Sequence, residues 1–263
     1  MKRKIIRILS KKFSKPLTCL TSYSPAISKI LDGNVDIILV GDSLGTTLYG
    51  MKNLKGVTIE MMKKHGLAVT NNVQKSITAI DMPYKSYTNK RQALKNAKDI
   101  IKYTKAKLLK LEINKKNMSI IKYLSEKNFN IIAHIGVTPQ SYNDFKKIKA
   151  LGRTNIQRDN LIRLAINAEK AGAIGVLLEC ITQETAKKIT SSISIPTIGI
   201  GSSKYCDGQI LVFDDLININ KMEKTPRFVK HYLQFANLAK KAVQKYSRDV
   251  KKGKYPNKRY SYK

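Results

Sequence analysis

The sequence predicts an α/β protein that forms a single (β/α)8 barrel of the TIM type. The chain has 263 residues, close to the roughly 250 that one such barrel needs. Short apolar runs alternate along it with longer amphipathic runs, as in a parallel sheet covered by helices. There are eight apolar runs, and no glycine-rich turn follows the first, which favours a closed barrel over an open doubly wound sheet.

The eight expected strands are short, mostly apolar and rich in β-branched residues. This composition is typical of parallel strands that are covered on both faces. We expect strands at Leu17–Tyr23, Val35–Asp42, Ser76–Met82, Lys107–Ile113, Phe129–Gly136, Ile174–Cys180, Ile195–Gly201 and Gln209–Phe213.

The stretches between these strands have the 3.6-residue periodicity of amphipathic helices. We expect helices at Pro25–Leu31, Ile59–Val73, Lys90–Thr104, Met118–Lys127, Arg158–Ala171 and Gln183–Ser192. Ser119 and Thr182 are plausible helix starts, because their hydroxyls can accept hydrogen bonds from free backbone N–H groups. Gly33, Asn128 and Gly172 stand where helices should end before the next strand.

No linker rich in proline, glycine or serine divides the chain, so we expect one barrel domain over residues 1–263. Residues 1–14 form a basic lead-in, and residues 226–263 form a C-terminal helix and tail, with the helix from Pro226 to about Val250. The longest segment without structure of its own is Val137–Gln157. Loops of this length in compact domains are usually lids or binding loops.

The formal net charge of +32 raises the question of a nucleic-acid partner. The basic residues are spread along the whole chain, and neither a zinc pattern nor an aromatic RNA-binding motif accompanies them. Compositional bias therefore explains the charge better than a specific nucleic-acid partner, and a positive field would also attract anionic substrates. Cys19, Cys180 and Cys206 are too few for a disulfide framework, and no apolar run is long enough to span a bilayer. We expect a cytoplasmic protein without a membrane partner.

Carboxylates stand at the ends of three neighbouring strands, where the chemistry of a barrel is located. They are Asp42 in VDIILVGDS, Asp81 in ITAIDMP and Glu112 in KLLKLEI. Buried charges are costly unless they are paired or bound to something, and a ligand set of oxygen atoms alone favours a hard ion such as Mg²⁺. The alternative for each acid is a helix cap or a lysine pair, and Lys110 lies between two of these acids in the sequence.

Four further polar residues belong to the same set of strand ends: Ser43, Lys110, His134 and Glu179. Ser43 follows Asp42, and Lys110 lies two residues before Glu112, so the side chains of this second pair share a face of the strand. His134 ends the fifth strand, where a lone histidine is more often a core residue than a catalyst.

Glu179 ends the sixth strand, with Val-Leu-Leu before it and cysteine after it. Such an apolar setting should raise its pKa towards the range of a general base.

Seven segments resemble the ketopantoate hydroxymethyltransferase family, in order and spacing, along nearly the whole chain. They are VGDSLGTTLYG (40–50), DMPY (81–84), KLE (110–112), HIGVTPQS (134–141), LLEC (177–180), IPTIGIGS (195–202) and DGQILV (207–212). The resemblance implies a barrel of the phosphoenolpyruvate mutase/isocitrate lyase group. It also implies the transfer of a hydroxymethyl unit from 5,10-methylenetetrahydrofolate to 3-methyl-2-oxobutanoate, which gives 2-dehydropantoate in pantothenate and coenzyme A biosynthesis.

The resemblance also implies roles for the matching residues. Asp42 and Asp81 resemble the ligands of one Mg²⁺ per subunit and contact the oxo acid, and Glu112 resembles a third, metal-associated acid. Ser43 and Lys110 resemble the residues that hold the substrate carboxylate.

In the same family pattern, Glu179 resembles the catalytic base and His134 lines the substrate pocket. The family's assembly implies a homodecamer. The sequence departs from the family pattern at 49–60, 146–155 and 201–208, which concern the lid and the folate side.

Two other functions compete with this interpretation. One is a Mg²⁺-dependent oxo-acid lyase or mutase of the same barrel group, which would need no folate. The other is a non-catalytic, basic nucleic-acid-binding barrel, which would be expected to have lost its strand-end acids. Asp42, Asp81, Glu112 and Glu179 are all present.

Overall fold

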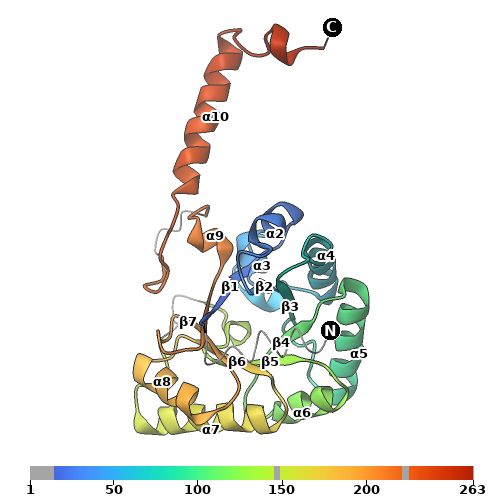
Figure 1. The fold of residues 1–263 in the computed structure, drawn as a ribbon, viewed down its shortest axis with the longest axis vertical. Helices are drawn as coiled ribbons and strands as arrows, with labels where there is room; N and C mark the ends of the chain where they lie inside the picture. Colours follow the sequence, from blue (N-terminus) through green and yellow to red (C-terminus); the bar gives the residue numbers. More distant parts are fainter. Residues whose placement is uncertain (1–14, 145–148, 221–224, 263) are drawn as a thin grey trace. The chain divides into compact units, whose positions relative to one another are not determined.

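The computed structural model describes residues 15–144, 149–220 and 225–262 of the chain. Its internal contacts divide the chain into two compact units, Met1–Val212 and Phe213–Lys263. The first unit contains a closed, all-parallel barrel with strand order β1 to β8, as the sequence predicts (Figure 1). The expected lead-in over residues 1–14 lies outside the described residues.

All eight predicted strands are present, and each is shorter than expected. Their bounds are β1 (Leu17–Thr21), β2 (Ile37–Val40), β3 (Ile77–Asp81), β4 (Leu108–Glu112), β5 (Ile131–Gly136), β6 (Gly175–Glu179), β7 (Thr197–Ile200) and β8 (Gly208–Leu211). Each strand pairs in parallel with the next, and β8 closes the barrel on β1 with Ile210 opposite Cys19.

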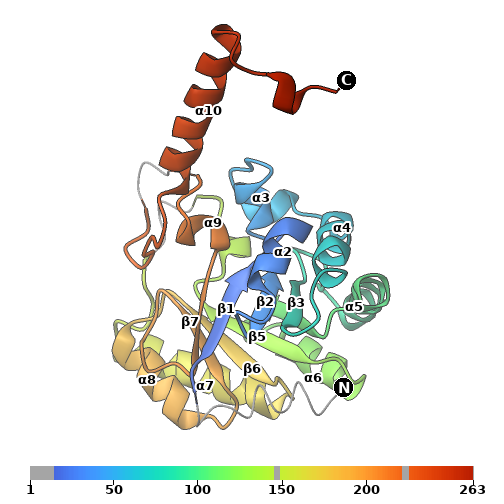
Figure 2. The same cartoon turned by 45° about the horizontal axis from the view of Figure 1, so that its top comes forward.

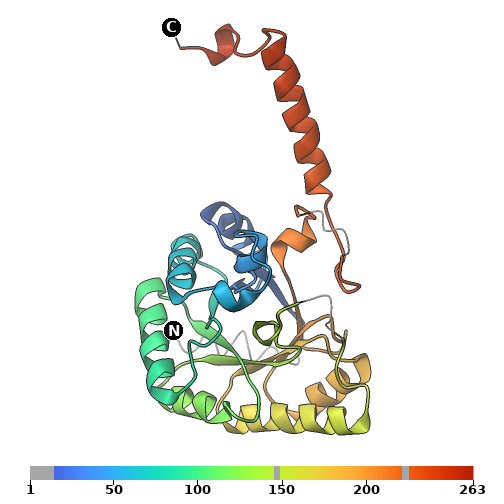
Figure 3. The same cartoon turned by 180° about the vertical axis from the view of Figure 1, so that it is seen from behind.

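Helices surround the barrel, and Figures 2 and 3 show α4 to α8 following one another round its outside. The helical segments of this unit are α2 (Pro25–Leu31), α3 (Leu44–Thr47), η2 (Leu54–Gly56), α4 (Ile59–Thr70), α5 (Lys90–Thr104), α6 (Met118–Glu126), η3 (Pro139–Ser141), α7 (Asn155–Lys170) and α8 (Gln183–Ser192). The predicted bounds of α2, α5 and α8 are confirmed at both ends.

Side-chain hydrogen bonds explain where α6 and α7 begin. The α7 helix begins three residues early, because the hydroxyl of Thr154 accepts a hydrogen bond from Gln157 N and so caps an earlier turn. The α6 helix begins at Met118, as its predicted bounds have it, so Ser119 lies in the first turn and is not the residue that caps it. The preceding Asn117 closes a turn by accepting from Asn114 N, and the helix follows directly.

The predicted helix ends are confirmed by the backbone. Gly33, Asn128 and Gly172 have φ values of 83°, 64° and 92°, a region that lets the chain leave a helix and that glycine and asparagine tolerate best. At Gly172 a Cβ would also lie 2.2 Å from Ser125 Oγ, so close packing adds a second requirement for glycine.

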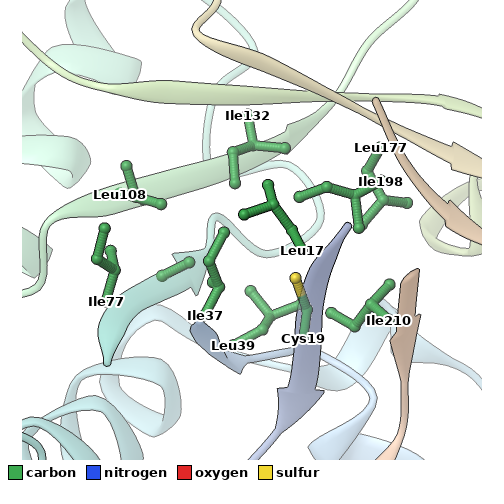
Figure 4. Close-up of a cluster of buried hydrophobic side chains, with 11 residues drawn as sticks. Leu17, Cys19, Ile37, Leu39, Ile77, Leu108, Ile132, Leu177, Ile198 and Ile210 are labelled. Atoms are coloured by element: carbon green, nitrogen blue, oxygen red, sulfur yellow. The ribbon is translucent and has the colours of Figure 1, made fainter. Parts of the chain in front are cut away.

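The barrel is filled by inward-facing side chains from all eight strands (Figure 4). Neighbouring residues of a strand face opposite sides, so every second residue contributes to this core. On β3 these residues are Ile77 and Ala79, and the next inward position is Asp81. On β4 the series is Leu108, then Lys110 and Glu112. The core therefore ends in a polar layer at the carboxyl ends of the strands.

The second unit contains α9 (Phe213–Leu216), α10 (Phe235–Lys251) and the short helix η5 (Lys258–Tyr260). The tail helix starts at Phe235, so its predicted start at Pro226 is wrong. Backbone hydrogen bonds from Tyr232 N to Leu216 O and from Phe235 N to Ile217 O tie the preceding segment to the end of α9 instead. Among the described residues, no helix has the length and apolar character needed to cross a membrane.

Gly136, at the end of β5, allows a test of how closely β5 packs against β6. Its φ is +99°, and a Cβ there would lie 2.3 Å from the backbone oxygen of Glu179. We expect Gly136→Ala to lose about 1–3 kcal/mol from backbone strain and a similar amount from overpacking. Thermal unfolding followed by circular dichroism measures the loss.

Gly50→Ala is the matched control for this substitution. Gly50 has a φ of +62° but nothing within 4 Å of its would-be Cβ, so only the backbone cost of about 1–2 kcal/mol applies. Equal losses of stability in the two variants would contradict the close approach between β5 and β6.

Candidate active site

The polar residues predicted at the strand ends come together in the structure above the barrel core. The pairing of β3 with β4 sets Asp81 opposite Lys110, and the pairing of β4 with β5 sets Glu112 opposite His134. These four residues and Asp42 are each at most 6% exposed. Their charges are therefore held in a region that excludes water, where electrostatic interactions are strong.

Asp42 and Ser43 follow β2 by two and three residues and do not end it as predicted, because the strand stops at Val40. The backbone N–H of Asp42 donates to Asp81 Oδ2 at 3.0 Å, which joins the ends of β2 and β3. The hydroxyl of Ser43 makes no cap bond to α3, and it lies 2.7 Å from Tyr23 OH instead. Ser43 is therefore turned towards Tyr23, two residues beyond the end of β1.

An ion pair links the two central strands, with Lys110 Nζ 2.8 Å from Asp81 Oδ1. Burial raises the pKa of Asp81 and the nearby Asp42 adds to this, while Lys110 opposes them; the pKa lies at about 7. Burial alone would lower the pKa of Lys110, but the carboxylates of Asp81, Asp42 and Glu112 outweigh it and raise that pKa. Lys110 therefore remains a cation at neutral pH.

His134 lies between the lysine and two acids. Its Nδ1 is 3.4 Å from Lys110 Nζ and 3.8 Å from Glu112 Oε1, and its Nε2 is 3.3 Å from Glu179 Oε2. Burial and the charge of Lys110 hold the pKa of His134 well below its usual range. The imidazole is therefore neutral at pH 7, and it contacts Glu179 without supplying a charge.

Glu179 is the most exposed acid of the group, with 18% of its side chain accessible. Burial raises its pKa to about 8 and Asp42 adds to the rise, although Lys110 opposes it. This agrees with the effect expected from the apolar residues around it in the sequence. A carboxylate with such a pKa, at the accessible side of a buried site, can take up a proton near neutral pH.

Two residues that the sequence analysis did not select complete the buried network. Gln140 Nε2 donates to Asp42 Oδ2 at 2.6 Å and to Met82 O at 3.0 Å. Tyr87 OH donates to Gln140 Oε1 at 2.8 Å. Gln140 lies in the HIGVTPQS segment and in the long loop after β5, and these two features are the sequence signals that could have found it.

The backbone N–H of Gln140 donates to Glu112 Oε1 at 3.1 Å. Burial and the charge of Asp42 nevertheless raise the pKa of Glu112 well above its usual range, against the opposing effects of Lys110 and this hydrogen bond. Glu112 is thus another buried acid whose negative charge is only partly compensated.

The donor set fits a hard divalent cation. The acids Asp42, Asp81, Glu112 and Glu179 share one buried lysine, and the raised pKa values show that the negative charge is only partly compensated. Among the described residues, no three His, Cys, Asp or Glu side chains lie so that they could hold a metal ion together. Mg²⁺ does not require three, because it usually binds one or two carboxylates and completes its octahedron with water and substrate oxygens.

Whole-chain relatives share one name. The chain matches the family described as ketopantoate hydroxymethyltransferase over residues 2–258. A 3-methyl-2-oxobutanoate hydroxymethyltransferase from Pelagibacter ubique is 42% identical over 262 residues, which cover 100% of both chains. Another of the same name, from Rhizobium rhizogenes, is 40% identical and covers 97% of this chain and 94% of its own.

Solved structures share the barrel at much lower identity. A 2,3-dimethylmalate lyase, described as a member of the phosphoenolpyruvate mutase/isocitrate lyase superfamily, has a TM-score of 0.64 at 12% identity and covers 94% of this chain and 87% of its own. A phosphonopyruvate hydrolase solved with oxalate and Mg²⁺ has a TM-score of 0.61 at 12% identity, with coverages of 98% and 92%. These likenesses confirm the predicted barrel fold.

The structural likeness concerns the fold alone, whereas the sequence matches extend over nearly the whole chain at 40% identity and above. They favour a transferase of pantothenate biosynthesis over both the lyase and the nucleic-acid-binding alternatives. The chain belongs to the ketopantoate hydroxymethyltransferase family.

Proposed function

We propose that the chain transfers a hydroxymethyl unit from 5,10-methylenetetrahydrofolate to 3-methyl-2-oxobutanoate and so forms 2-dehydropantoate and tetrahydrofolate. The observation that carries this proposal is the position of Glu179. Its carboxylate has a pKa raised to about 8 and lies at the accessible side of a buried group of acids and one lysine. This arrangement suits the removal of a proton from a small anionic substrate.

Lys110 and Ser43 hold the oxo acid in this proposal. Lys110 is buried and remains charged, so its ammonium can bind the substrate carboxylate while it keeps its ion pair with Asp81. Ser43 can add a hydrogen bond while its oxygen stays in contact with Tyr23 OH. A buried cation also favours an acid over a neutral ketone as substrate. With a neutral ketone bound, the ammonium of Lys110 would have no substrate carboxylate to balance its charge.

Asp42 and Asp81 would hold one Mg²⁺, with Glu112 as the nearby third acid. The support is the fit of oxygen donors and uncompensated negative charge to a hard cation. When bound, the ion supplies positive charge that stabilises the negative charge developing on the 2-oxo oxygen.

Glu179 takes the proton from C3 of the oxo acid, and His134 positions its carboxylate through the 3.3 Å contact with Nε2. The resulting enolate carbon attacks the methylene carbon of the folate, so that a C–C bond replaces one of its two C–N bonds. Water then replaces the second C–N bond with the C–O bond of the hydroxyl group. The two folate nitrogens take up the proton that Glu179 removed and one proton of the water. Because His134 is neutral, it contacts Glu179 without forming an ion pair that would lower the basicity of the carboxylate.

The proposal also includes the cell compartment and the assembly. Cys19, Cys180 and Cys206 are all free thiols, which fits a reducing compartment such as the cytoplasm. A homodecamer is the assembly that the family resemblance implies, and the mass of the purified protein in solution would test it.

Deuterium exchange at C3 of 3-methyl-2-oxobutanoate, followed by NMR, tests the proposed reaction and its base. We expect the wild-type protein with Mg²⁺ to exchange this proton, and to give a hydroxymethyl signal only when the folate is added. Glu179→Gln should bind the oxo acid but exchange about 10²–10⁴-fold more slowly, the usual contribution of a positioned base. Glu184→Gln, at a site whose side chain is 70% exposed, should behave as wild type. Wild-type exchange in Glu179→Gln would remove Glu179 as the base.

The raised pKa of Glu179 also predicts a pH dependence of stability. The folded-state pKa of about 8 lies above the ordinary 4.5. The carboxyl group therefore contributes its full share to the free energy of unfolding below pH 4.5, and this contribution is lost as the pH rises to about 8. Gln at this position cannot ionise. We expect Glu179→Gln and wild type to melt at similar temperatures at pH 5 without metal. At pH 8 the variant should melt roughly 10 °C higher, because a pKa change from 4.5 to about 8 corresponds to roughly 4–5 kcal/mol and each kcal/mol to about 2–4 °C. A temperature difference that does not change with pH would show that the pKa is not raised.

Asp81→Asn tests the metal assignment with little change in shape. The amide oxygen of asparagine can still accept the hydrogen bond from Asp42 N. The substitution removes the negative charge that pairs with Lys110 and would bind the proposed ion. We expect Mg²⁺-dependent C3 exchange to fall at least about 100-fold, because carboxylates are the main protein ligands of this ion. Circular dichroism should show an intact barrel. Exchange at the wild-type rate would contradict the role of Asp81.

A further inference from the structure

Gln140 connects the carboxyl ends of three strands from a loop that belongs to none of them. It is 3% exposed, and its amide nitrogen donates to Asp42 after β2 and to the carbonyl of Met82 after β3. Its backbone N–H donates to Glu112 at the end of β4. One residue therefore provides hydrogen bonds to two of the three acids assigned to the ion.

The network leaves one orientation for the side-chain amide. Met82 O can only accept a hydrogen bond, so the NH₂ group must face it, and the same group reaches the Asp42 carboxylate. The amide oxygen then faces Tyr87 OH, which donates to it. A flipped amide would place oxygen against oxygen at two contacts. Tyr87 thus holds Gln140, and Gln140 in turn holds one oxygen of Asp42.

The local backbone holds Gln140 in place. Pro139 restricts the start of the short helix η3, and backbone hydrogen bonds from Ser141 N to Thr138 O and from Tyr142 N to Pro139 O close its turns. The amide position is therefore set by the turn as well as by its partners.

We propose that Gln140 is a positioning residue for the divalent cation: it sets the rotation of the Asp42 carboxylate through its amide and that of Glu112 through its backbone N–H, with Tyr87 as the anchor of the amide. The inference rests on the proposed function. Hydrogen-bond partners behind metal ligands commonly change metal affinity by about 10–100-fold, because a ligand that is already oriented loses less freedom on binding.

Mn²⁺ titration of the full-length protein, followed by electron paramagnetic resonance without substrate, tests the inference directly. Gln140→Met keeps the side-chain size and the backbone N–H but removes both amide hydrogen bonds. We expect its Mn²⁺ dissociation constant to rise about 10–100-fold. Tyr87→Phe keeps Gln140 but frees its amide to turn, so we expect a smaller rise, between wild type and Gln140→Met.

Thr104→Val is the control for a general loss of stability. Thr104 is fully buried and donates to Ile100 O at 2.7 Å, at the opposite end of β4 from the site. The variant should melt at a lower temperature but bind Mn²⁺ as wild type does. Saturating Mn²⁺ should restore kcat in Gln140→Met and leave its KM for the metal raised, which a misfolded protein would not show.

Two outcomes would overturn the inference, and they differ from each other. If Gln140→Met binds Mn²⁺ within about threefold of wild type while Asp81→Asn does not bind it, the metal site stands and Gln140 has only a structural role. If the wild-type protein itself binds no Mn²⁺, the proposed ion and this inference fail together.

Discussion

The imbalance of buried charge at the top of the barrel governs the properties of this site. Four carboxylates lie around one lysine, and the Lys110–Asp81 pair at 2.8 Å is the closest compensation they have. Acids that are deprived of water and of sufficient positive charge are poor at losing protons, which is why the pKa values of Asp81, Glu112 and Glu179 are all raised. A cation and an anionic substrate held by Lys110 would interact favourably with this field, so the charge imbalance that costs the fold stability also prepares the site to bind.

The same strands carry the stabilising core and the charged site, and the alternation of side chains keeps the two apart. Inward positions near the start of a strand are apolar, and those at its end are polar, as Leu108, Lys110 and Glu112 show on β4. The apolar layer holds the strand ends in a fixed register, so Glu112 and His134 meet by backbone pairing alone. Because the closed barrel already fixes the positions of these side chains, they lose little further conformational entropy when the substrate binds.

The barrel leaves the identity of the reaction open. Solved barrels that share it carry the names of lyases, hydrolases and mutases, which shows that the fold supplies a location for the site and little about its chemistry. At 9–12% identity, this chain shares the barrel with them but few of its residues. Residues outside the strands, such as Gln140 and Ser43, contact the site residues as closely as the strand residues do.

The sequence by itself determined the eight strands, the helices between them and the acids Asp42, Asp81, Glu112 and Glu179 as candidates. These features follow from local periodicity, because every second residue of a strand lies on the same face and a polar residue at the strand end differs from its apolar neighbours. The resemblance of several motifs to one family added the expected reaction.

Only the tertiary structure decided the hydrogen-bond network that connects those acids. Gln140 and Asp42 are 98 residues apart, and Tyr87 and Gln140 are 53 apart, so no local pattern records that they meet. The start of α10 at Phe235 was likewise decided by backbone hydrogen bonds to the end of α9. Such contacts depend on the paths of loops, which short-range periodicity does not determine, and the raised pKa values depend in turn on how those paths exclude water.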